Sequence, residues 1–173
     1  HNLENAQAAA AVGRIAGLDD ERIERAVASF KGVEHRLELV AEHGAIRWYN
    51  DSKATNPDAA RVGLSSFEGT PVVLIAGGYG SGFELAEWLA AVRAGTRAVV
   101  LIGSSAELLE RELAGHPTVR AASLEGAVRE AGRLARPGDV VLLSPGYKSF
   151  DMFKSYEDRG RRFKAAVREV AGG

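Results

Sequence analysis

The stretch VVLIAGGYGSGFELAEWLAAVRAGTRAVVLI, residues 72–102, decides the fold. Apolar runs rich in β-branched residues occupy its two ends, at 72–76 and 97–102, and their length is typical of buried strands. Between them, residues 83–93 repeat apolar side chains at helical spacing. A strand, a helix and a strand in this order predict two parallel strands, because the helix returns the chain to the starting edge of the sheet.

The same alternation continues on both sides of this stretch. Residues 37–50, LELVAEHGAIRWYN, predict a hairpin of two alternating strands that turns at His43-Gly44. Further strands are expected at 118–121 and 139–143, and further helices at 57–66, 105–113, 123–135 and 149–170. Apolar strands separated by amphipathic helices indicate a Rossmann-like α/β fold, a mostly parallel sheet with helices on both faces.

The residues before the hairpin have a purely helical pattern. We expect one helix at 3–16 and a second that starts at Asp19 or Asp20 and closes at Gly32. The change of pattern near residues 31–36 suggests a domain boundary. The chain starts without a methionine and without the basic segment of a signal peptide, so we expect it to begin inside a longer protein.

Composition excludes several classes of protein and of site. The chain has no cysteine, which rules out disulfides, thiolate metal sites and cysteine nucleophiles. A net charge of −1 gives no reason to expect nucleic acid or an acidic membrane as a partner, and no apolar run is long enough to span a bilayer. The four histidines lie far apart, so their spacing predicts no metal site. These features fit a cytoplasmic protein.

Ligands of such sheets bind beyond the carboxyl ends of the strands, so the loops that follow strands are the candidate sites. The first, NDSKATNPDAA at 50–60, has Pro57 placed for the first turn of a helix and Asn56 or Thr55 placed to cap it. The unpaired N–H groups of a helix start, with Lys53 beside them, form an anion site in outline. The other interpretation is an ordinary turn from a strand to a helix.

The second loop, AGGYGSGFE at 76–84, is rich in glycine, which permits sharp turns and a close approach to a ligand. The sequence contains no Walker A motif, and the loop lacks the G-x-G-x-x-G spacing of dinucleotide-binding proteins. No acidic residue ends the following strand, where Gly103 and Ser104 stand. A tight structural turn and a contact to a ligand both remain open for this loop.

The third loop, SPGYKSFDMFKSYEDRG at 144–160, precedes the last helix. We expect Ser149 to cap that helix, with Lys148 immediately before its amino terminus. Two helix starts with a lysine each, at one edge of a sheet, would suit a small substrate with two carboxylates. The alternative is an ordinary capped helix whose aromatic side chains, Phe150, Phe153 and Tyr156, pack in the core.

Taken together, these segments resemble the Mur ligases, and the D-glutamate-adding branch of that family best. The segments that carry the resemblance are HNLENAQAA, EHRLELV, RWYNDSKATNPDAA, VVLIAGGYGSGFEL and GDVVLLSPGYKSFDMFKSYEDRGRRF, which span essentially the whole chain. The resemblance implies that residues 1–32 are the last helices of a central ATP-binding domain. Residues 33–173 would be the carboxyl-terminal Mur ligase domain.

The family's chemistry implies ATP and Mg²⁺ as cofactors, both held mainly by the central domain. ATP converts a carboxylate of UDP-N-acetylmuramoyl-L-alanine into an acyl phosphate, and the amine of D-glutamate attacks it. The tetrahedral intermediate then expels phosphate, which is one step of peptidoglycan synthesis. We expect a monomer, and we expect this chain to be inactive by itself because it contains no Walker A lysine.

The resemblance also implies roles for single residues. The residues implied for the nucleotide are Asn2 and Asn5 at the adenine, Arg36 at the phosphates and Asp51 at the ribose hydroxyls. The residues implied for D-glutamate are Lys53, Thr55, Ser149 and the backbone of Phe150, with Tyr156 packed alongside. His35 and Lys53 are the catalytic candidates, with His35 beside the reaction centre.

Two positions depart from the family's pattern. Ser81 stands near the place where the glycine loop of relatives offers a lysine, and Gly146-Tyr147-Lys148 replaces small residues of the last loop. Lys148 either compensates for the missing lysine or points to solvent. Two alternative functions also remain open: another Mur or folylpolyglutamate-type ligase domain, and a non-catalytic module that binds a nucleotide or a dicarboxylic amino acid.

Overall fold

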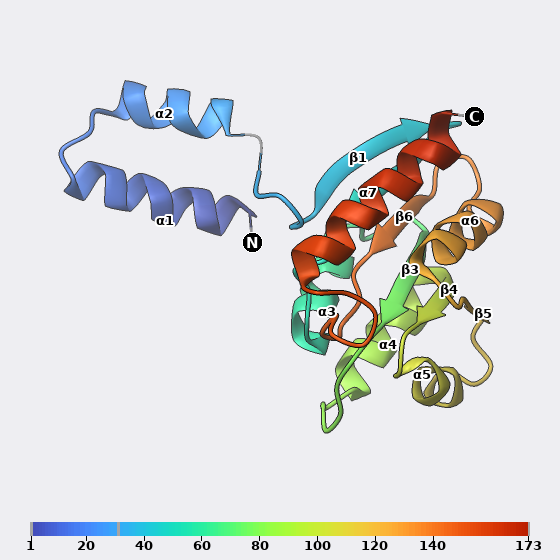
Figure 1. Ribbon diagram of the computed structural model, residues 1–173. Coiled ribbons are helices and arrows are strands. Elements are labelled where there is room, and N and C mark those ends of the chain that lie inside the picture. Colours follow the sequence, from blue (N-terminus) through green and yellow to red (C-terminus); the bar gives the residue numbers. More distant parts are fainter. Residues whose placement is uncertain (1, 31, 173) are drawn as a thin grey trace. The chain divides into compact units, whose positions relative to one another are not determined.

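The computed structural model describes residues 2–30 and 32–172, with side chains described for 5–30 and 32–171. The chain divides into two compact units, His1–Gly32 and Val33–Gly173. The first contains helices α1 (Asn2–Ile15) and α2 (Asp20–Ser29), drawn in blue in Figure 1. Asp19 caps α2, because its carboxylate accepts a hydrogen bond of 2.8 Å from the amide of Arg22. Both predicted helices are present.

The second unit is built on a six-stranded sheet with the order β1-β2-β6-β3-β4-β5. β1 and β2 form the predicted hairpin and are antiparallel, whereas every other neighbouring pair is parallel. This confirms the mostly parallel sheet. The strands are β1 (Glu38–His43), β2 (Ile46–Asn50), β3 (Val72–Gly77), β4 (Thr96–Ile102), β5 (Thr118–Arg120) and β6 (Val140–Leu143).

Helices cover both faces of this sheet (Figure 1) because alternate strand residues point to opposite faces. On one face, Val72 and Leu74 of β3 belong to a core that includes residues of α3, α4 and α5. On the other face, Val73 and Ile75 belong to a second core with residues of α6 and α7. The helices are α3 (Pro57–Ser65), α4 (Ala86–Gly95), α5 (Ala106–Glu112), α6 (Leu124–Leu134) and α7 (Tyr156–Gly172).

The start of the last helix differs from the prediction. α7 begins at Tyr156, not at Ser149, so Ser149 does not cap it. Ser155 lies immediately before the helix, and its hydroxyl accepts a hydrogen bond of 3.3 Å from the amide of Asp158. In return, the Asp158 carboxylate accepts one from the amide of Lys154 at 3.2 Å. This reciprocal pair at residues 154–158 fixes the helix start seven residues later than expected.

The expected hairpin turn at His43-Gly44 is also displaced by one residue. His43 still belongs to β1, and the turn consists of Gly44 and Ala45, both with positive φ, at 57° and 60°. Two left-handed residues give the tight turn whose twist matches that of paired strands. Among the described residues, no helix combines the length and the apolar character that a bilayer crossing requires.

The strand order creates a switch point beside β3. From β3 the chain proceeds outward to β4 and β5, then crosses back to form β6 on the other side of β3. The loops that leave β3 and β6 therefore start side by side at the carboxyl edge of the sheet, and the loop that leaves β2 lies beside that of β6. This is the place where α/β sheets bind ligands.

Candidate functional site

The loop after β2 is held firmly, and it exposes one lysine. Asn56 caps α3, because its side-chain oxygen accepts a hydrogen bond of 2.8 Å from the amide of Ala59, and Pro57 occupies the first turn as predicted. Ser52 is fully buried, whereas the side chain of Lys53 is exposed. The amide of Lys53 donates a hydrogen bond of 3.0 Å to the carbonyl oxygen of His35. This bond joins the loop to the segment that precedes β1.

His35 is enclosed, and its hydrogen-bond partners select one tautomer of the ring. The side-chain oxygen of Asn50 accepts a hydrogen bond from the Ser52 amide (3.2 Å), which leaves the Asn50 NH₂ group to donate to Glu38 (3.0 Å) and to Nδ1 of His35 (2.9 Å). Nδ1 is therefore an acceptor, and Nε2 carries the proton. Burial also lowers the pKa of His35, although Glu34 opposes this effect.

Tyr156, the first residue of α7, joins His35 and Lys53 into one cluster. The Lys53 Nζ lies 5.4 Å from the centroid of the Tyr156 ring, within the range of a cation–π contact. The His35 ring meets the Tyr156 ring edge to face at 6.1 Å. The hydroxyl of Ser52 donates a hydrogen bond of 2.8 Å to the Tyr156 carbonyl. The structure thus brings together three of the residues singled out in the sequence.

Asp51 lies at the end of β2 and is only 5 % exposed. Its carboxylate accepts hydrogen bonds from the Ser144 hydroxyl (2.7 Å) and from the amide of Leu37 (3.3 Å). Burial raises the pKa of Asp51 to about 6, against the effects of these donors and of the nearby Arg36. Asp51 thus ties the segment before β1 to the loop after β6. Its contact with a ribose stays a prediction.

The glycine loop after β3 has a structural reason for its composition. A Cβ on Gly77 would lie 2.2 Å from the carbonyl oxygen of Ile102, and one on Gly78 would lie 2.3 Å from that of Lys148. Both residues also have positive φ, at 111° and 144°. Beyond them, Tyr79 and Lys148 exchange two main-chain hydrogen bonds. The glycines allow this loop to pack against its neighbours, as the interpretation of a tight structural turn expects.

The residues predicted to hold an amino acid occupy different depths in the three loops. Thr55 is half-buried, Ser149 is 2 % exposed and Phe150 is 65 % exposed. Asp151, which follows Phe150 in this loop, accepts a hydrogen bond of 2.7 Å from the amide of Ser104. The second helix-start anion site expected at Lys148 and Ser149 is therefore wrong, because no helix starts there.

Arg159 is a residue of the site that the sequence analysis missed. It is fully buried and donates to the Ser52 hydroxyl (2.9 Å), the Ser52 carbonyl (2.8 Å) and the Tyr147 carbonyl (3.1 Å). Burial lowers its pKa to about 10. A signal was available, because Arg159 lies three residues after Tyr156 and four before the buried Phe163, on the apolar stripe of the last helix.

One acidic group has the spacing of a metal site. Ligand atoms of Glu34, His35 and Glu38 lie within 4.8 Å of one another. The Nζ of Lys164, however, binds the carboxylates of Glu34 at 2.6 Å and Glu38 at 2.9 Å. The lysine cation already offsets one of the two carboxylate charges and binds an oxygen of each carboxylate, so the arrangement does not favour a Mg²⁺ ion held by these residues.

The other residues predicted to contact the nucleotide make no defined site among the described residues. Arg36 is exposed just before β1, and Asn5 is exposed on α1 of the first unit. The side chain of Asn2 lies outside the described residues.

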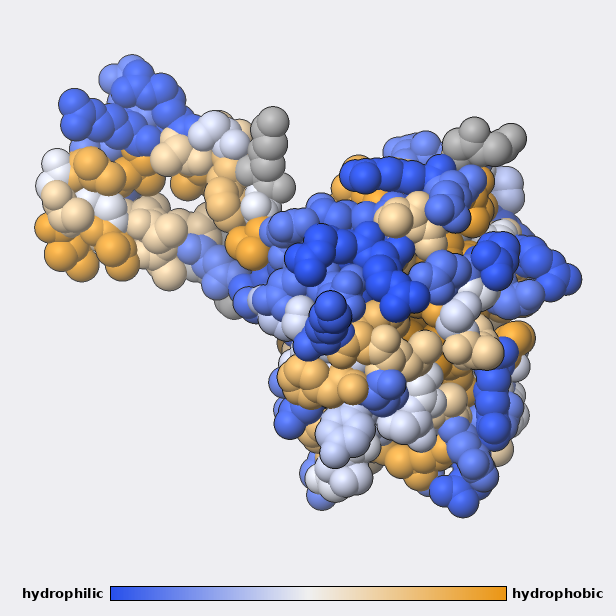
Figure 2. All heavy atoms as spheres, viewed as in Figure 1, coloured by the Kyte–Doolittle hydropathy of each residue, from blue (hydrophilic) through white to orange (hydrophobic). Residues whose placement is uncertain are grey.

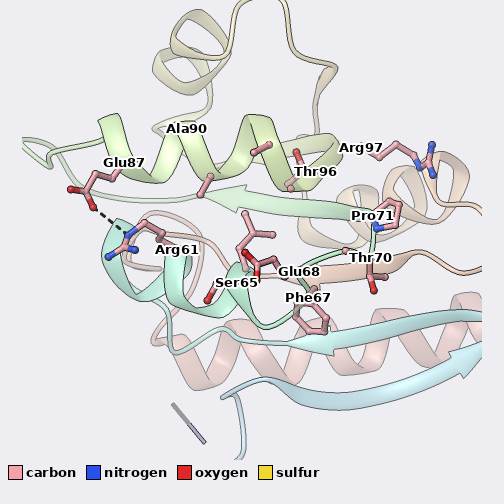
Figure 3. Close-up of a pocket in the computed structure, with 15 residues that line it drawn as sticks. Arg61, Ser65, Phe67, Glu68, Thr70, Pro71, Glu87, Ala90, Thr96 and Arg97 are labelled. Carbon is pink, nitrogen blue, oxygen red and sulfur yellow. Dashed lines mark ion pairs between the residues drawn. The ribbon is translucent and has the colours of Figure 1, made fainter.

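A groove of about 930 Å³ lies between α3 and α4, away from this cluster (Figure 3). Its lining includes Pro71 and Thr96, which stand where β3 and β4 begin, whereas the predicted site residues follow strand ends. An ion pair of 3.6 Å joins Arg61 to Glu87 across it. The candidate site is therefore the edge formed by the three loops, on the basis of strand topology and cation placement rather than of cavity size.

Fold and site together define an α/β domain whose carboxyl edge carries cations suited to an acidic ligand. The family model of the Mur ligase, glutamate ligase domain, matches residues 35–146, and the chain belongs to this family. It is 45 % identical over 175 residues to a UDP-N-acetylmuramoylalanine–D-glutamate ligase of Caldanaerobacter subterraneus subsp. tengcongensis, with 98 % of this chain and 39 % of the relative covered. The ligase of the same name from Geotalea daltonii is 46 % identical over 174 residues, with 100 % and 38 % covered.

The chain therefore spans under two fifths of the length of these curated relatives. Solved structures agree with the fold. The UDP-N-acetylmuramate–alanine ligase of Thermotoga maritima matches with a TM-score of 0.72 at 20 % identity, over 98 % of this chain and 38 % of that one. The bifunctional folylpolyglutamate synthase/dihydrofolate synthase of Yersinia pestis matches with 0.64 at 24 %, over 86 % and 34 %.

Proposed function

We propose that this chain is the carboxyl-terminal, amino-acid-binding part of an ATP-dependent ligase that adds D-glutamate to UDP-N-acetylmuramoyl-L-alanine in peptidoglycan synthesis. The observation that carries the proposal is the similarity to relatives named for this activity, which extends over 98–100 % of the chain at 44–46 % identity. The cation-lined carboxyl edge of the sheet supports it. The structures of the other Mur and folylpolyglutamate-type ligases support the fold alone, at 24 % identity or less.

In this proposal ATP supplies the phosphoryl group that activates the carboxylate of UDP-N-acetylmuramoyl-L-alanine, and Mg²⁺ and ATP are held mainly outside this chain. The residues proposed for D-glutamate are Lys53, Thr55, Ser149 and the Phe150 backbone, with Tyr156 alongside. Those proposed for the nucleotide are Asn2, Asn5, Arg36 and Asp51. The amine of D-glutamate forms the new C–N bond, and phosphate leaves from the tetrahedral intermediate.

His35 has a defined part in this scheme. Its Nδ1 accepts a hydrogen bond from Asn50, so a neutral ring has its only N–H at Nε2. Such a group donates a hydrogen bond to an anionic oxygen and takes up no proton from the incoming amine by itself while Nδ1 is engaged. The proposed role is to stabilise negative charge beside the reaction centre, while Lys53 orients the amino acid.

The first unit is proposed to be the end of the central domain. It leaves large apolar side chains exposed, among them Val12 (66 %), Ile15 (87 %) and Phe30 (68 %). Figure 2 shows hydrophobic residues on the surface of this helical pair. Apolar surface of this kind marks a contact with further protein. We also propose a cytoplasmic monomer.

The proposal is tested by phosphate release in the full-length protein that carries this chain. Release should require ATP, UDP-N-acetylmuramoyl-L-alanine and D-glutamate together, and the 173-residue chain alone should release none. Turnover with a different amino acid but not with D-glutamate would contradict the assignment. Turnover by this chain alone would contradict the proposal that it is only one part of the ligase.

A substitution of Lys53 tests the site within the same assay. A charged hydrogen bond contributes about 1.5–3 kcal/mol, so Lys53→Ala should raise the KM for D-glutamate by roughly ten- to a hundredfold. The KM for ATP should change far less, because Lys53 is proposed to contact the amino acid. Asn5→Ala is the matched control. It should raise the KM for ATP and leave the KM for D-glutamate unchanged. Equal losses for both ligands in Lys53→Ala would assign Lys53 to the phosphates instead.

A further inference from the structure

Lys148 is fixed in place by its main chain although its side chain is exposed. Its amide donates to the Tyr79 carbonyl at 3.1 Å, and its carbonyl accepts from the Tyr79 amide at 2.8 Å. These two bonds form an antiparallel bridge between the third loop and the glycine loop. Directly opposed residues of such a pair project their side chains to the same side, so Lys148 has a defined direction of exit from the backbone.

The loop that carries Lys148 is also joined to the loop that carries Lys53. The two lysines follow the ends of β6 and β2, which are neighbours in the sheet. The amide of Gly146 donates to the carbonyl of Ala54 at 3.0 Å and so joins their loops. The guanidinium of Arg159 binds the carbonyls of Ser52 and Tyr147, the residues immediately before the two lysines. One buried side chain therefore ties together the main chain just before each lysine.

Both cations lack acidic partners within the described part of the chain. No ion pair among the described residues includes Lys53 or Lys148. Asp151, the nearest acid after Lys148 in the sequence, accepts its hydrogen bond from the Ser104 amide instead. Two lysines on joined loops at one edge of the sheet, with a buried arginine between these loops, create a positive potential that suits two negative charges on one ligand.

We propose that Lys148 binds the second carboxylate of the amino-acid substrate and, with Lys53, selects a dicarboxylic amino acid. This inference rests on the proposed function. It gives a role to Lys148, which stands where the family resemblance predicts a small residue. Lys148, which is bridged to the glycine loop, thereby supplies the cation that Ser81 of that loop does not.

The test is steady-state kinetics of the full-length protein with Lys148→Ala, Lys148→Arg and, as a control, Lys154→Ala. Lys154 belongs to the same loop and is exposed, so its loss changes the local charge equally. Lys148→Ala should raise the KM for D-glutamate by about tenfold or more, with little change in kcat and in the KM for ATP. Lys148→Arg should restore most of the affinity, and Lys154→Ala should have a much smaller effect.

The dependence of KM on ionic strength provides a second test. The KM of the unsubstituted protein for D-glutamate should rise with ionic strength more steeply than that of Lys148→Ala, because the variant lacks one of the screened charges. An unchanged KM in Lys148→Ala, or equal losses in Lys148→Ala and Lys154→Ala, would overturn the inference and leave the proposed function intact. If the unsubstituted protein showed no D-glutamate-dependent phosphate release, the proposed function would fail, and the ligand assigned to Lys148 would fail with it.

Discussion

The helical unit His1–Gly32 and the α/β unit Val33–Gly173 differ in how they bury apolar side chains. In the α/β unit, residues 72–76 of β3 are at most 1 % exposed, enclosed between two helical layers. In the helical unit, among described residues 5–30, only Ile23 is buried, while Ile15 is 87 % exposed. The α/β unit thus has its own core and can hold three loops in fixed positions. The helical unit buries little apolar surface of its own.

The largest expected difference concerns folding of the separate units. The fragment 33–173 should unfold cooperatively, because it contains both cores. A peptide of residues 1–32 should have little helix in water, since its helices are 14 and 10 residues long and such lengths are marginal alone. Circular dichroism and thermal unfolding of the two pieces measure this. A stably helical peptide with a cooperative transition would break the comparison.

A matched pair of substitutions tests the difference between the two units further. Phe163 of α7 is fully buried, so Phe163→Ala should lower the free energy of unfolding of the 173-residue chain by about 3–5 kcal/mol. Ile15→Ala removes an exposed side chain and should change it by about 0.5 kcal/mol or less. Urea denaturation gives both values. A large cost for Ile15→Ala would show that the helical unit buries this residue in the isolated chain.

A further effect is a pH dependence that belongs to the α/β unit. The pKa of Asp51 is about 6 in the folded protein, above its ordinary value of 3.8. Between these two values the folded state keeps a proton that the unfolded state has lost, so stability falls as pH rises. Above about pH 6 the ionisation of Asp51 lowers the free energy of unfolding by roughly 3 kcal/mol, relative to acidic pH. The variant Asp51→Asn cannot ionise and should lose less stability than the parent chain between about pH 4 and about pH 7.

Other carboxylates act in the opposite direction, so the difference between the two proteins is the quantity to measure. Burial acts to raise the pKa of Asp139, for example, but the hydrogen bonds from Arg97 and from the Arg136 amide outweigh it and leave this pKa lowered. Its contribution is common to both proteins and cancels in the comparison. Identical pH profiles for the parent chain and Asp51→Asn would show that Asp51 titrates normally.

Local patterns were sufficient to predict most of the fold. The apolar runs of β3 and β4, the intervening helix and the Pro57–Asn56 helix start follow from spacing and capping chemistry, which act over a few residues. The start of α7 could not be predicted in this way. Ser149 and Ser155 are both acceptable caps. The hydrogen bonds from the Asp158 amide to Ser155 and from the Lys154 amide to Asp158, together with the bond from the Ser104 amide to Asp151, decide between them.

The sequence by itself determined the alternation of strands and helices, the three loops at strand ends and the lysines within them. Only the tertiary structure decided how these loops are joined, because hydrogen bonds between residues distant in sequence have no local signature. Arg159 binds Ser52 across 107 positions, and Asn50 fixes the protonated nitrogen of His35 across 15. The residue types that bind a ligand are visible in a sequence, whereas the buried donors and acceptors that orient them depend on which strands become neighbours.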